Sequence, residues 1–352
     1  MQIFCIIFAT INDFIKMSIG LKEISQLTGY SLSTVSRVLS NKISGNSKSA
    51  KVILNTAREI GYSKYRETAP SSNRILDIAL ITQHYSEEFY AYLYAGFDKV
   101  CSENNHSLTI HSLRYNSSIT KQLKYLSQYH DGFILFLPTL DTNNYMQIKK
   151  SLSNYPVISI APVFEPIFDT FTFDSYQGGA LAASQFLNSE INTFGIIHGP
   201  SEKWEAELRK NGFKDIIEKS GATISWNYYG DYSFESGESA FHDINKKSKS
   251  KMGIFASNDQ MAVGFIHAAL ENNKKIPGDY FIIGYDNILF SKVFFPKLTT
   301  INTNVNKLSS EALDYLIRKI KGQVKAEAIA KKTLIPVELV ARDTHKRGQN
   351  DK

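Results

Sequence analysis

The sequence of 352 residues contains few cysteines and none of the common catalytic motifs. Its two cysteines, Cys5 and Cys101, lie far apart, which argues against a disulfide framework, and no Cys or His spacing resembles a zinc site. A glycine-rich phosphate loop, a G-x-S-x-G elbow and an HExxH helix are missing. We therefore expect no catalytic residue, metal or cofactor, and a cytoplasmic protein in which His198 and His242 are structural.

The sequence also lacks an apolar run that could span a bilayer. The run from Ile3 to Ile11 is too short for this, and it lacks the basic residues that open an export signal. Met17 stands immediately before the first clear helical pattern. We expect translation to begin at Met17 and residues 1–16 to be a non-native overhang, although a start at Met1 stays open.

What the sequence does contain, between residues 21 and 39, is the pattern of two short helices joined by a tight turn. Apolar residues of the first helix share one face: Leu21, Ile24 and Leu27. Gly29 is free to take the left-handed conformation that ends a helix, and Ser31 can cap a second helix starting near Leu32. In the second helix Val35 and Val38 form the buried stripe with Leu39. The pattern predicts a helix-turn-helix.

In a helix-turn-helix, the first turn of the second helix enters the major groove of DNA. Short hydroxyl side chains there reach phosphates, and an arginine can contact a guanine edge. Residues expected to position the helix are Ser31, Thr34 and Ser36. Residues expected to read bases are Leu32, Ser33 and Arg37. The alternative is a helical hairpin without a DNA role, because Ser and Thr are common near helix starts.

Charge favours the DNA-binding interpretation. Residues 17–74 hold nine basic and three acidic side chains, a net charge of +6, and the whole chain also sums to +6. The remaining residues are therefore neutral overall. A positive excess confined to the segment with the helix pair is what phosphate neutralisation requires.

A third helix, expected over Lys51 to Ile60 and ended by Gly61, would complete a small head. Its expected core is Leu21, Ile24, Leu27, Val35, Val38, Ile53 and Ile60. The polar stretch from 62 to 73 contains Pro70 and has no apolar periodicity, which indicates a linker. We assign residues 17–62 to a DNA-binding domain and residues 63–74 to a hinge.

After the hinge, short apolar runs alternate with helical stretches. The runs expected to be strands are Ile75–Ile81, Phe133–Leu137, Val157–Ile160, Phe194–Ile197, Met252–Ala256 and Phe281–Gly284. This alternation predicts parallel sheets covered by helices, in two lobes over residues 75–345. Ligands of such sheets bind at the carboxyl ends of strands, here between the lobes. The tail, residues 346–352, has no heptad repeat that would form a tetramer.

With these residues placed, the chain resembles the lactose-repressor (LacI/GalR) family of bacterial transcription regulators from about Leu21 to Arg342. The strongest match is LKEISQLTGYSLSTVSRVLSN followed by AREIGY. Two further matches are SNDQMAVGFIHAAL, which begins at Ser257, and IGYDN followed by FPKLTTI, which ends at Ile301. Within the family, regulators of galactoside or other sugar operons are the most similar.

The resemblance implies a helix-turn-helix head followed by a two-lobed α/β body like a periplasmic binding protein. It also implies a homodimer on near-palindromic operator DNA and a sugar effector between the lobes. Effector contacts in the family match Asp174, Asn258 and Asp286, with aromatic packing by Phe89, Tyr232 and Phe294. Carboxylates and amides suit sugar hydroxyls, and aromatic rings suit the apolar face of a pyranose. Asn258 or Asp259 could instead be only a helix cap, and Phe89 and Tyr232 only core.

Two departures from the family pattern matter. Glu207 stands where family members commonly have an arginine, and the basic residue is Arg209; we count both as effector-site residues and expect an uncharged sugar. The hinge lacks the usual proline after Gly-Tyr, and Ser71 falls near the position of the leucine that wedges into the minor groove. Residues expected to contact phosphates instead are Lys64, Tyr65 and Arg66.

The sequence thus predicts a DNA-binding repressor of a sugar-utilisation operon, controlled by a small sugar. The alternative is a sugar-binding protein without a DNA role, which would leave the head unexplained. The sequence does not identify the sugar or the operator, or show whether the effector releases or promotes DNA binding.

Overall fold

The structure is a computed structural model that describes residues 20–39, 47–60, 62, 74–83, 88–114, 118–161, 163–189, 191–247, 251–324 and 329–345. The chain divides into two compact units, one with the N-terminal helices and one with the body that begins at Leu76. The expected overhang, the hinge as far as residue 73 and the tail lie outside the described residues.

The head contains three helices: α2 (Leu21–Thr28), α3 (Leu32–Leu39) and α4 (Lys48–Glu59). Gly29 ends α2 in the left-handed conformation, with φ of 71°, and its N–H donates to the Ser25 carbonyl at 3.0 Å. The Ser31 hydroxyl accepts a hydrogen bond from the Thr34 N–H at 3.2 Å, which caps α3. Both turn signals expected from the sequence are confirmed.

The core of the head is small and its composition corrects one expectation. Its buried side chains are Ile24, Val35, Val38, Ala50, Ile53, Ala57 and Tyr62. Leu27, expected in this core, is 61% exposed. Each residue turns a helix by about 100°. Leu21 and Thr28, both half-buried, therefore lie to one side of the buried Ile24 around the helix, whereas Leu27 lies about 60° from Ile24 on the other side.

The body contains two six-stranded sheets. The first lobe has the strand order β11-β5-β4-β3-β1-β2, and the second has β12-β10-β9-β8-β6-β7. Strands of the first lobe are β1 (Asp77–Thr82), β2 (Ser107–Ser112), β3 (Gly132–Phe136), β4 (Val157–Ser159), β5 (Thr170–Phe173) and β11 (Lys332–Ile335). Strands of the second are β6 (Phe194–His198), β7 (Ile224–Tyr229), β8 (Met252–Ala256), β9 (Tyr280–Asp286), β10 (Thr299–Thr303) and β12 (Val337–Val340). Strand pairs are parallel except β10 with β12. All six predicted strands are confirmed: β8 has the predicted bounds, and the other five have shifted ends.

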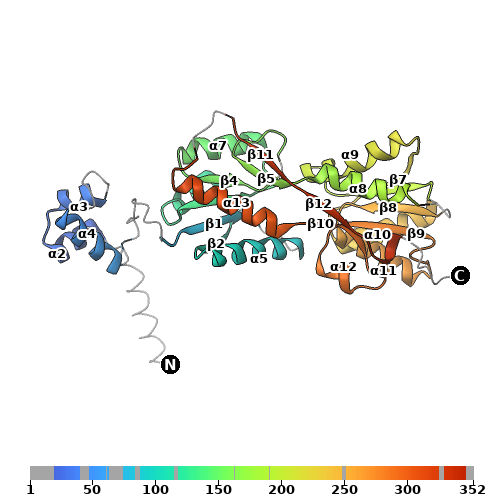
Figure 1. The fold of residues 1–352 in the computed structure, drawn as a ribbon, viewed down its shortest axis with the longest axis horizontal. Helices are drawn as coiled ribbons and strands as arrows, with labels where there is room; N and C mark the ends of the chain where they lie inside the picture. The colour runs from blue at the N-terminus through green and yellow to red at the C-terminus, as the bar shows by residue number, and fades with distance from the viewer. Residues whose placement is uncertain are drawn as a thin grey trace, which may run out of the picture. The chain divides into compact units, whose positions relative to one another are not determined.

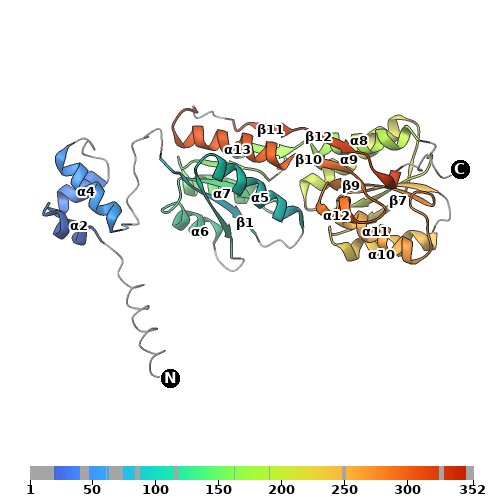
Figure 2. The same cartoon turned by 60° about the horizontal axis from the view of Figure 1, so that its bottom comes forward.

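Helices cover both sheets, as Figures 1 and 2 show. The first lobe has α5 (Glu88–Glu103), α6 (Ile119–Leu126), α7 (Thr142–Leu152) and α13 (Val305–Ile320). The second has α8 (Ser175–Leu187), α9 (Trp204–Lys219), α10 (Phe234–Lys247), α11 (Asp259–Glu271), the short α12 (Leu289–Val293) and a 3-10 turn (Asp343–His345). The chain passes between the lobes after β5, after β10 and after β11. Three crossings place the carboxyl ends of strands from both sheets around one cleft.

Among the helices in the described part of the chain, none combines the length and the apolar content needed to cross a bilayer.

Candidate DNA-binding face and effector cavity

The outer face of α3 carries the residues expected to contact DNA. Ser31, Ser33, Ser36 and Arg37 are exposed, and Thr34 is half-buried. Leu32 is 47% exposed, an unusual position for a leucine in a head whose other aliphatic residues on α3 face the core. The remaining residues expected at DNA, Lys64, Tyr65 and Arg66, lie outside the described residues.

Hydroxyl groups at the start of α3 form a connected cluster. The Ser31 hydroxyl lies 2.9 Å from the hydroxyl oxygens of both Ser33 and Thr34. All three groups stand at a helix N-terminus, where the helix dipole favours an anion. The arrangement suits contact with a phosphate, with Arg37 one helical turn further along the same exposed surface.

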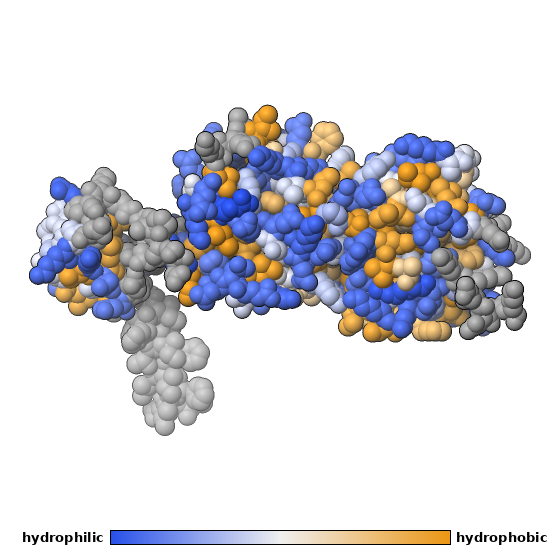
Figure 3. All heavy atoms as spheres, viewed as in Figure 1, coloured by the Kyte–Doolittle hydropathy of each residue, from blue (hydrophilic) through white to orange (hydrophobic). Residues whose placement is uncertain are grey.

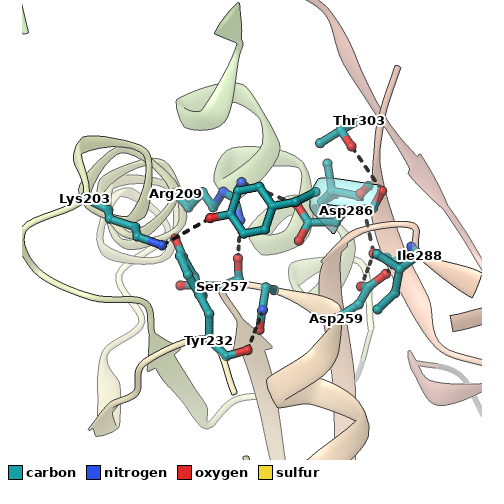
Figure 4. A network of polar contacts seen from close by, with 12 residues as sticks. Lys203, Arg209, Tyr232, Ser257, Asp259, Asp286, Ile288 and Thr303 are labelled. Atoms are coloured by element: carbon teal, nitrogen blue, oxygen red, sulfur yellow. Dashed lines mark hydrogen bonds and ion pairs between the residues drawn. The ribbon is translucent and has the colours of Figure 1, made fainter. Parts of the chain in front are cut away.

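A cavity lies between the two lobes of the body. Its volume, including open space at the mouth, is about 620 Å³. Its lining residues are Phe89, Tyr90, Leu93, Phe136, Ile160, Thr172, Phe173, Ser175, Glu205, Arg209, Tyr232, Asn258, Asp286 and Leu308. Figure 4 shows Lys203, Arg209 and Tyr232 facing the same space as Asp286.

Arg209 is the central charge of this cavity. The residue is 6% exposed, and its guanidinium donates to the Ser257 carbonyl at 2.5 Å and stacks 3.7 Å from the centre of the Tyr285 ring. Its Nη2 lies 3.4 Å from Oδ1 of Asp286. Burial lowers the pKa of Arg209, but Asp286, Tyr232, Tyr285 and Glu205 together outweigh burial, and the pKa is raised. Arg209 is therefore charged at every physiological pH.

Asp286, at the end of β9, is held in an uncommon state. Burial raises the pKa of its carboxyl to about 7, and Arg209 only partly opposes this shift. The backbone φ of Asp286 is 110°, and that of Tyr232, which lines the same cavity, is 76°. Such conformations of non-glycine residues cost about 1–3 kcal/mol each and cluster at binding sites.

Asn258 both caps a helix and lines the cavity. Its Oδ1 accepts a hydrogen bond from the Met261 N–H at 2.9 Å at the start of α11, and its Nδ2 donates to the Tyr232 carbonyl at 2.9 Å. Asn258 can therefore be a helix cap and an effector-site residue at the same time. Its side-chain amide holds the loop in which Tyr232 has a positive φ against α11.

Glu205 and Lys203, at the start of α9, add two charges that the sequence analysis missed. Burial raises the pKa of Glu205, although Arg209 and Lys203 favour its ionised form. The Lys203 ammonium lies 4.9 Å from the Tyr232 ring centre and donates to the Tyr90 hydroxyl at 3.3 Å. The sequence signal that could have indicated both residues is their position just after strand β6, at the edge of the sheet where parallel strands end.

Buried polar atoms around the cavity lack hydrogen-bond partners among the described residues. They are Oε2 of Glu205, Nε of Arg209, the hydroxyl of Tyr232 and Oδ1 of Asp286, the last in ion-pair contact with Arg209 only. Leaving such a group unsatisfied costs about 1–3 kcal/mol. A polar ligand that enters the cavity would supply the missing partners.

The structure brings together five of the eight expected effector-site residues: Phe89, Arg209, Tyr232, Asn258 and Asp286. Asp174 lies beside the cavity residues Phe173 and Ser175, but its carboxylate caps α8 by accepting from the Gln177 N–H at 3.0 Å. Phe294 follows α12 and packs against the core of the second lobe.

Glu207 requires a correction. Its carboxylate pairs with Lys210 and does not line the cavity. Glu205 and Arg209 are four residues apart and share a face of α9, whereas Glu207 lies about 200° around the helix from Glu205. The acidic group that α9 contributes to the cavity is therefore Glu205, and Arg209 is the arginine of α9 that faces the cavity.

Within the described residues, no group of three or more His, Cys, Asp or Glu side chains could hold a metal ion.

Comparison with known proteins agrees with this architecture. A periplasmic-binding-protein-like domain matches residues 183–345. The ribose operon repressor of Escherichia coli (strain K12) is 27% identical over 316 residues, covering 85% of this chain and 92% of that repressor. The repressor PurR of Histophilus somni (strain 2336) is 25% identical over 332 residues, covering 93% and 98%. A lac repressor dimer bound to operator and the anti-inducer ONPF has the same fold, with a TM-score of 0.69, 21% identity and coverage of 93% and 99%.

A helix-turn-helix head joined to a two-lobed binding body defines a ligand-controlled DNA-binding regulator. In its motifs, its fold and its relatives, the chain is similar to the lactose-repressor (LacI/GalR) family of transcription regulators.

Proposed function

We propose that this protein represses a sugar-utilisation operon and that a small neutral sugar in the cavity controls its affinity for operator DNA. The observation that carries the proposal is the set of unpartnered buried polar atoms on Glu205, Arg209, Tyr232 and Asp286. Sugar hydroxyls both donate and accept hydrogen bonds, so one pyranose or furanose ring can satisfy carboxylates and a guanidinium together.

Charge balance supports an uncharged effector. Arg209 and two carboxylates, Glu205 and Asp286, line the cavity, and Lys203 contacts the lining residues Tyr90 and Tyr232. When both carboxylates are ionised, these formal charges cancel, and an ionic ligand would then leave one buried charge without a partner, which is costly. The name of the ribose operon repressor, a relative over most of the chain, also favours a sugar.

A homodimer on DNA fits the surface of the body. Apolar side chains that are 51–80% exposed gather on and just after α12: Leu289, Phe290, Val293 and Phe295. Figure 3 shows apolar side chains along the lower edge of the body, where Figure 1 labels α12. Self-association through such a surface would present two heads to two half-sites of a near-palindromic operator, in the cytoplasm where the DNA is.

The alternative, a sugar-binding protein without a DNA role, is disfavoured by the head. Its exposed Leu32, Ser33 and Arg37 have no function in that alternative, and relatives matched over most of the chain are named repressors. The same relatives favour a regulatory rather than a catalytic role.

The test is retention of a fluorescent duplex from the region upstream of the protein's own gene, at moderate salt, before and after adding each of a panel of neutral sugars. We expect salt-sensitive binding that one sugar changes at least fivefold. Asp286→Ala should abolish the sugar response and keep DNA binding, whereas Glu207→Ala, on the outer side of α9, should keep both. Folded protein without affinity for any duplex would refute the proposal.

A further inference from the structure

Three of the chain's eight histidines contact one another or the first residues of the body. His106 stands just before β2, His111 lies within β2, and His130 stands two residues before β3. None of the three lines the effector cavity. The body begins at Leu76, shortly after the hinge in the sequence, and β1 begins one residue later. The contacts of these histidines therefore bear on the junction of hinge and body, and the proposed function gives them no role.

His111 and His130 form a hydrogen bond between their imidazole rings. The two Nε2 atoms lie 2.8 Å apart and the ring centres 4.9 Å apart. His130 is 8% exposed, so water cannot readily replace this bond. One Nε2 must donate a proton and the other must accept it, because two protonated nitrogens cannot form a hydrogen bond with each other. A proton on each Nε2 therefore breaks the pair.

His106 makes a second contact that protonation breaks, with the backbone. Its Nδ1 accepts a hydrogen bond from the Leu76 N–H at 3.4 Å and lies 3.0 Å from the carbonyl oxygen of Asn105. An unprotonated Nδ1 can accept from Leu76, whereas a protonated Nδ1 can only donate, and Asn105 offers the acceptor beside it. Protonation of His106 thus removes this acceptor from the residue at which the body begins.

The residue after His130 fixes the start of β1. The Asp131 N–H donates to the Asp77 carbonyl at 2.7 Å, and Oδ2 of Asp131 accepts from the Asp77 N–H at 2.9 Å. A shift of His130 moves Asp131, because the two are neighbours in the chain. The imidazole pair therefore acts on Asp77 through Asp131, and His106 acts on Leu76 directly.

The surroundings keep both contacts intact at neutral pH. Burial lowers the pKa of His111. Burial also lowers the pKa of His106, Lys321 adds to this effect, and the Asn105 carbonyl and Asp131 oppose it only in part. Both contacts therefore break as the pH falls below the ordinary histidine value of 6.5. The other titratable side chains beside the pair, or on the helix that leads to it, are Asp77, Lys121, Lys124, Tyr129 and Tyr155.

We propose, on the basis of the proposed function, that His106, His111 and His130 make operator binding sensitive to acid, independently of the effector. At neutral pH their contacts hold residues 76 and 77 and so anchor the hinge to the first lobe. Protonation releases this anchor. A looser anchor leaves the head more conformational freedom, which must be lost when the head is fixed on DNA, so affinity falls.

The expected sign separates this effect from ordinary electrostatics. Acid adds positive charge to histidines, and added positive charge strengthens the attraction to DNA phosphates. Residues 17–74 contain no histidine, so the head itself gains no histidine charge on acidification. A loss of DNA affinity in acid must therefore come from the body and act against the charge effect.

The test is fluorescence anisotropy of the full chain with a labelled duplex from the region upstream of its own gene. The titrations are made without effector, at constant ionic strength, from about pH 7.5 to about pH 5.5, on either side of the ordinary histidine pKa. We expect the wild type to lose affinity at least tenfold over this range. Circular dichroism at each pH verifies that the chain stays folded.

Two isosteric variants remove the titrating groups and keep the hydrogen bonds. In His111→Gln the amide reaches the position of Nε2, and in His106→Asn the amide oxygen can accept from the Leu76 N–H. The double variant should lose affinity less than threefold between the same pH values, and each single variant should fall in between. His242→Gln, at an exposed residue of α10 in the second lobe, is the control and should behave as the wild type.

Hydrogen exchange of the wild type gives a measurement that needs no variant. After correction for the intrinsic rate at each pH, the first residues of β1 should exchange faster in acid, whereas β8 should not change. Unchanged protection of β1, a wild-type affinity that stays constant or rises in acid, or an equal loss in the double variant overturns this inference. Salt-sensitive binding at neutral pH leaves the proposed function standing in each of these cases. If no duplex binds at any pH, the proposed function fails and this inference fails with it.

Discussion

Glu88 and Leu289 join the two lobes through one hydrogen bond. The Leu289 N–H, at the start of α12 in the second lobe, donates to Oε1 of Glu88, at the start of α5 in the first lobe, at 2.9 Å. The adjacent Phe89 lines the cavity. This hydrogen bond therefore exists only when the lobes are close together beside the effector site.

Glu88→Ala should weaken effector binding by favouring separated lobes. A hydrogen bond of this kind contributes about 0.5–1.5 kcal/mol, so we expect a loss of up to about tenfold in effector affinity, measured by titration calorimetry. Glu103→Ala, at the exposed far end of α5 where the carboxylate only approaches Lys99 at 3.9 Å, is the control. An unchanged affinity in Glu88→Ala would show that this contact does not bias the lobes.

Much of the fold could be predicted because buried parallel strands read as apolar runs. β3 and β8, for example, are buried at every residue, and the runs at Phe133 and Met252 marked them. Among the strands that were missed, β2 and β7 are edges of their sheets and mix exposed with buried residues, including Ile110 at 43% and Tyr229 at 71% exposure. Strands β5 and β10 lie inside their sheets, but threonines interrupt their apolar runs. None of these strands has the continuous apolar run by which a buried strand is recognised in a sequence.

The site was predictable where it follows strand ends and unpredictable where it depends on helix phase or lobe contact. Asn258 and Asp286 directly follow or end buried strands, so the sequence indicated them. The choice between Glu205 and Glu207 depended on which face of α9 meets the cavity, and a short motif match did not fix it. The aromatic rings of Phe89, Phe136 and Phe173 meet at the cavity from α5, β3 and β5 of the first lobe, which lie far apart in the sequence, so a local pattern does not record them.

Arg37→Ala should reduce sequence discrimination by the head. Arg37 is exposed on α3, and loss of a guanine contact costs about 1–3 kcal/mol at one base position in each half-site. The measurement is a titration of the variant with a duplex selected from a random pool and with its single-base variants. Uniform weakening on every duplex, with a salt slope smaller by about one, would show instead that Arg37 contacts only a phosphate.

Asp286 should make stability depend on pH. Its carboxyl has a pKa of about 7 in the folded protein, against about 3.9 when unfolded. The folded state binds more protons between these pH values. The contribution of this carboxyl to the free energy of unfolding is therefore greatest below about pH 4 and is lost as the pH rises toward 7. This group accounts for at most about 4 kcal/mol across that window.

Urea unfolding of Asp286→Asn between pH 5 and pH 8 tests this dependence. The variant should lose less stability with rising pH than the wild type, whatever its stability at any one pH. Glu205, whose pKa is also raised, adds a dependence of the same sign, so Glu205→Gln should flatten the profile further. Parallel profiles for the wild type and Asp286→Asn would contradict the raised pKa of Asp286.

Gly179→Ala should damage both stability and the effector site. A Cβ at Gly179, on α8, would clash with the carbonyl oxygen of Arg209 and approach the Phe213 N–H to 2.8 Å, and both are backbone groups of α9 that cannot rotate away. We expect a loss of about 3 kcal/mol in the free energy of unfolding, together with weaker effector binding, because the displaced turn of α9 carries the Arg209 guanidinium.

Gly221→Ala is the matched control. Gly221 has a φ of 83°, but nothing lies within 4 Å of the added carbon. Backbone strain of about 1–2 kcal/mol should therefore destabilise the chain without altering effector affinity. Equal effects of the two substitutions on binding would show that close packing of α8 on α9 does not position Arg209.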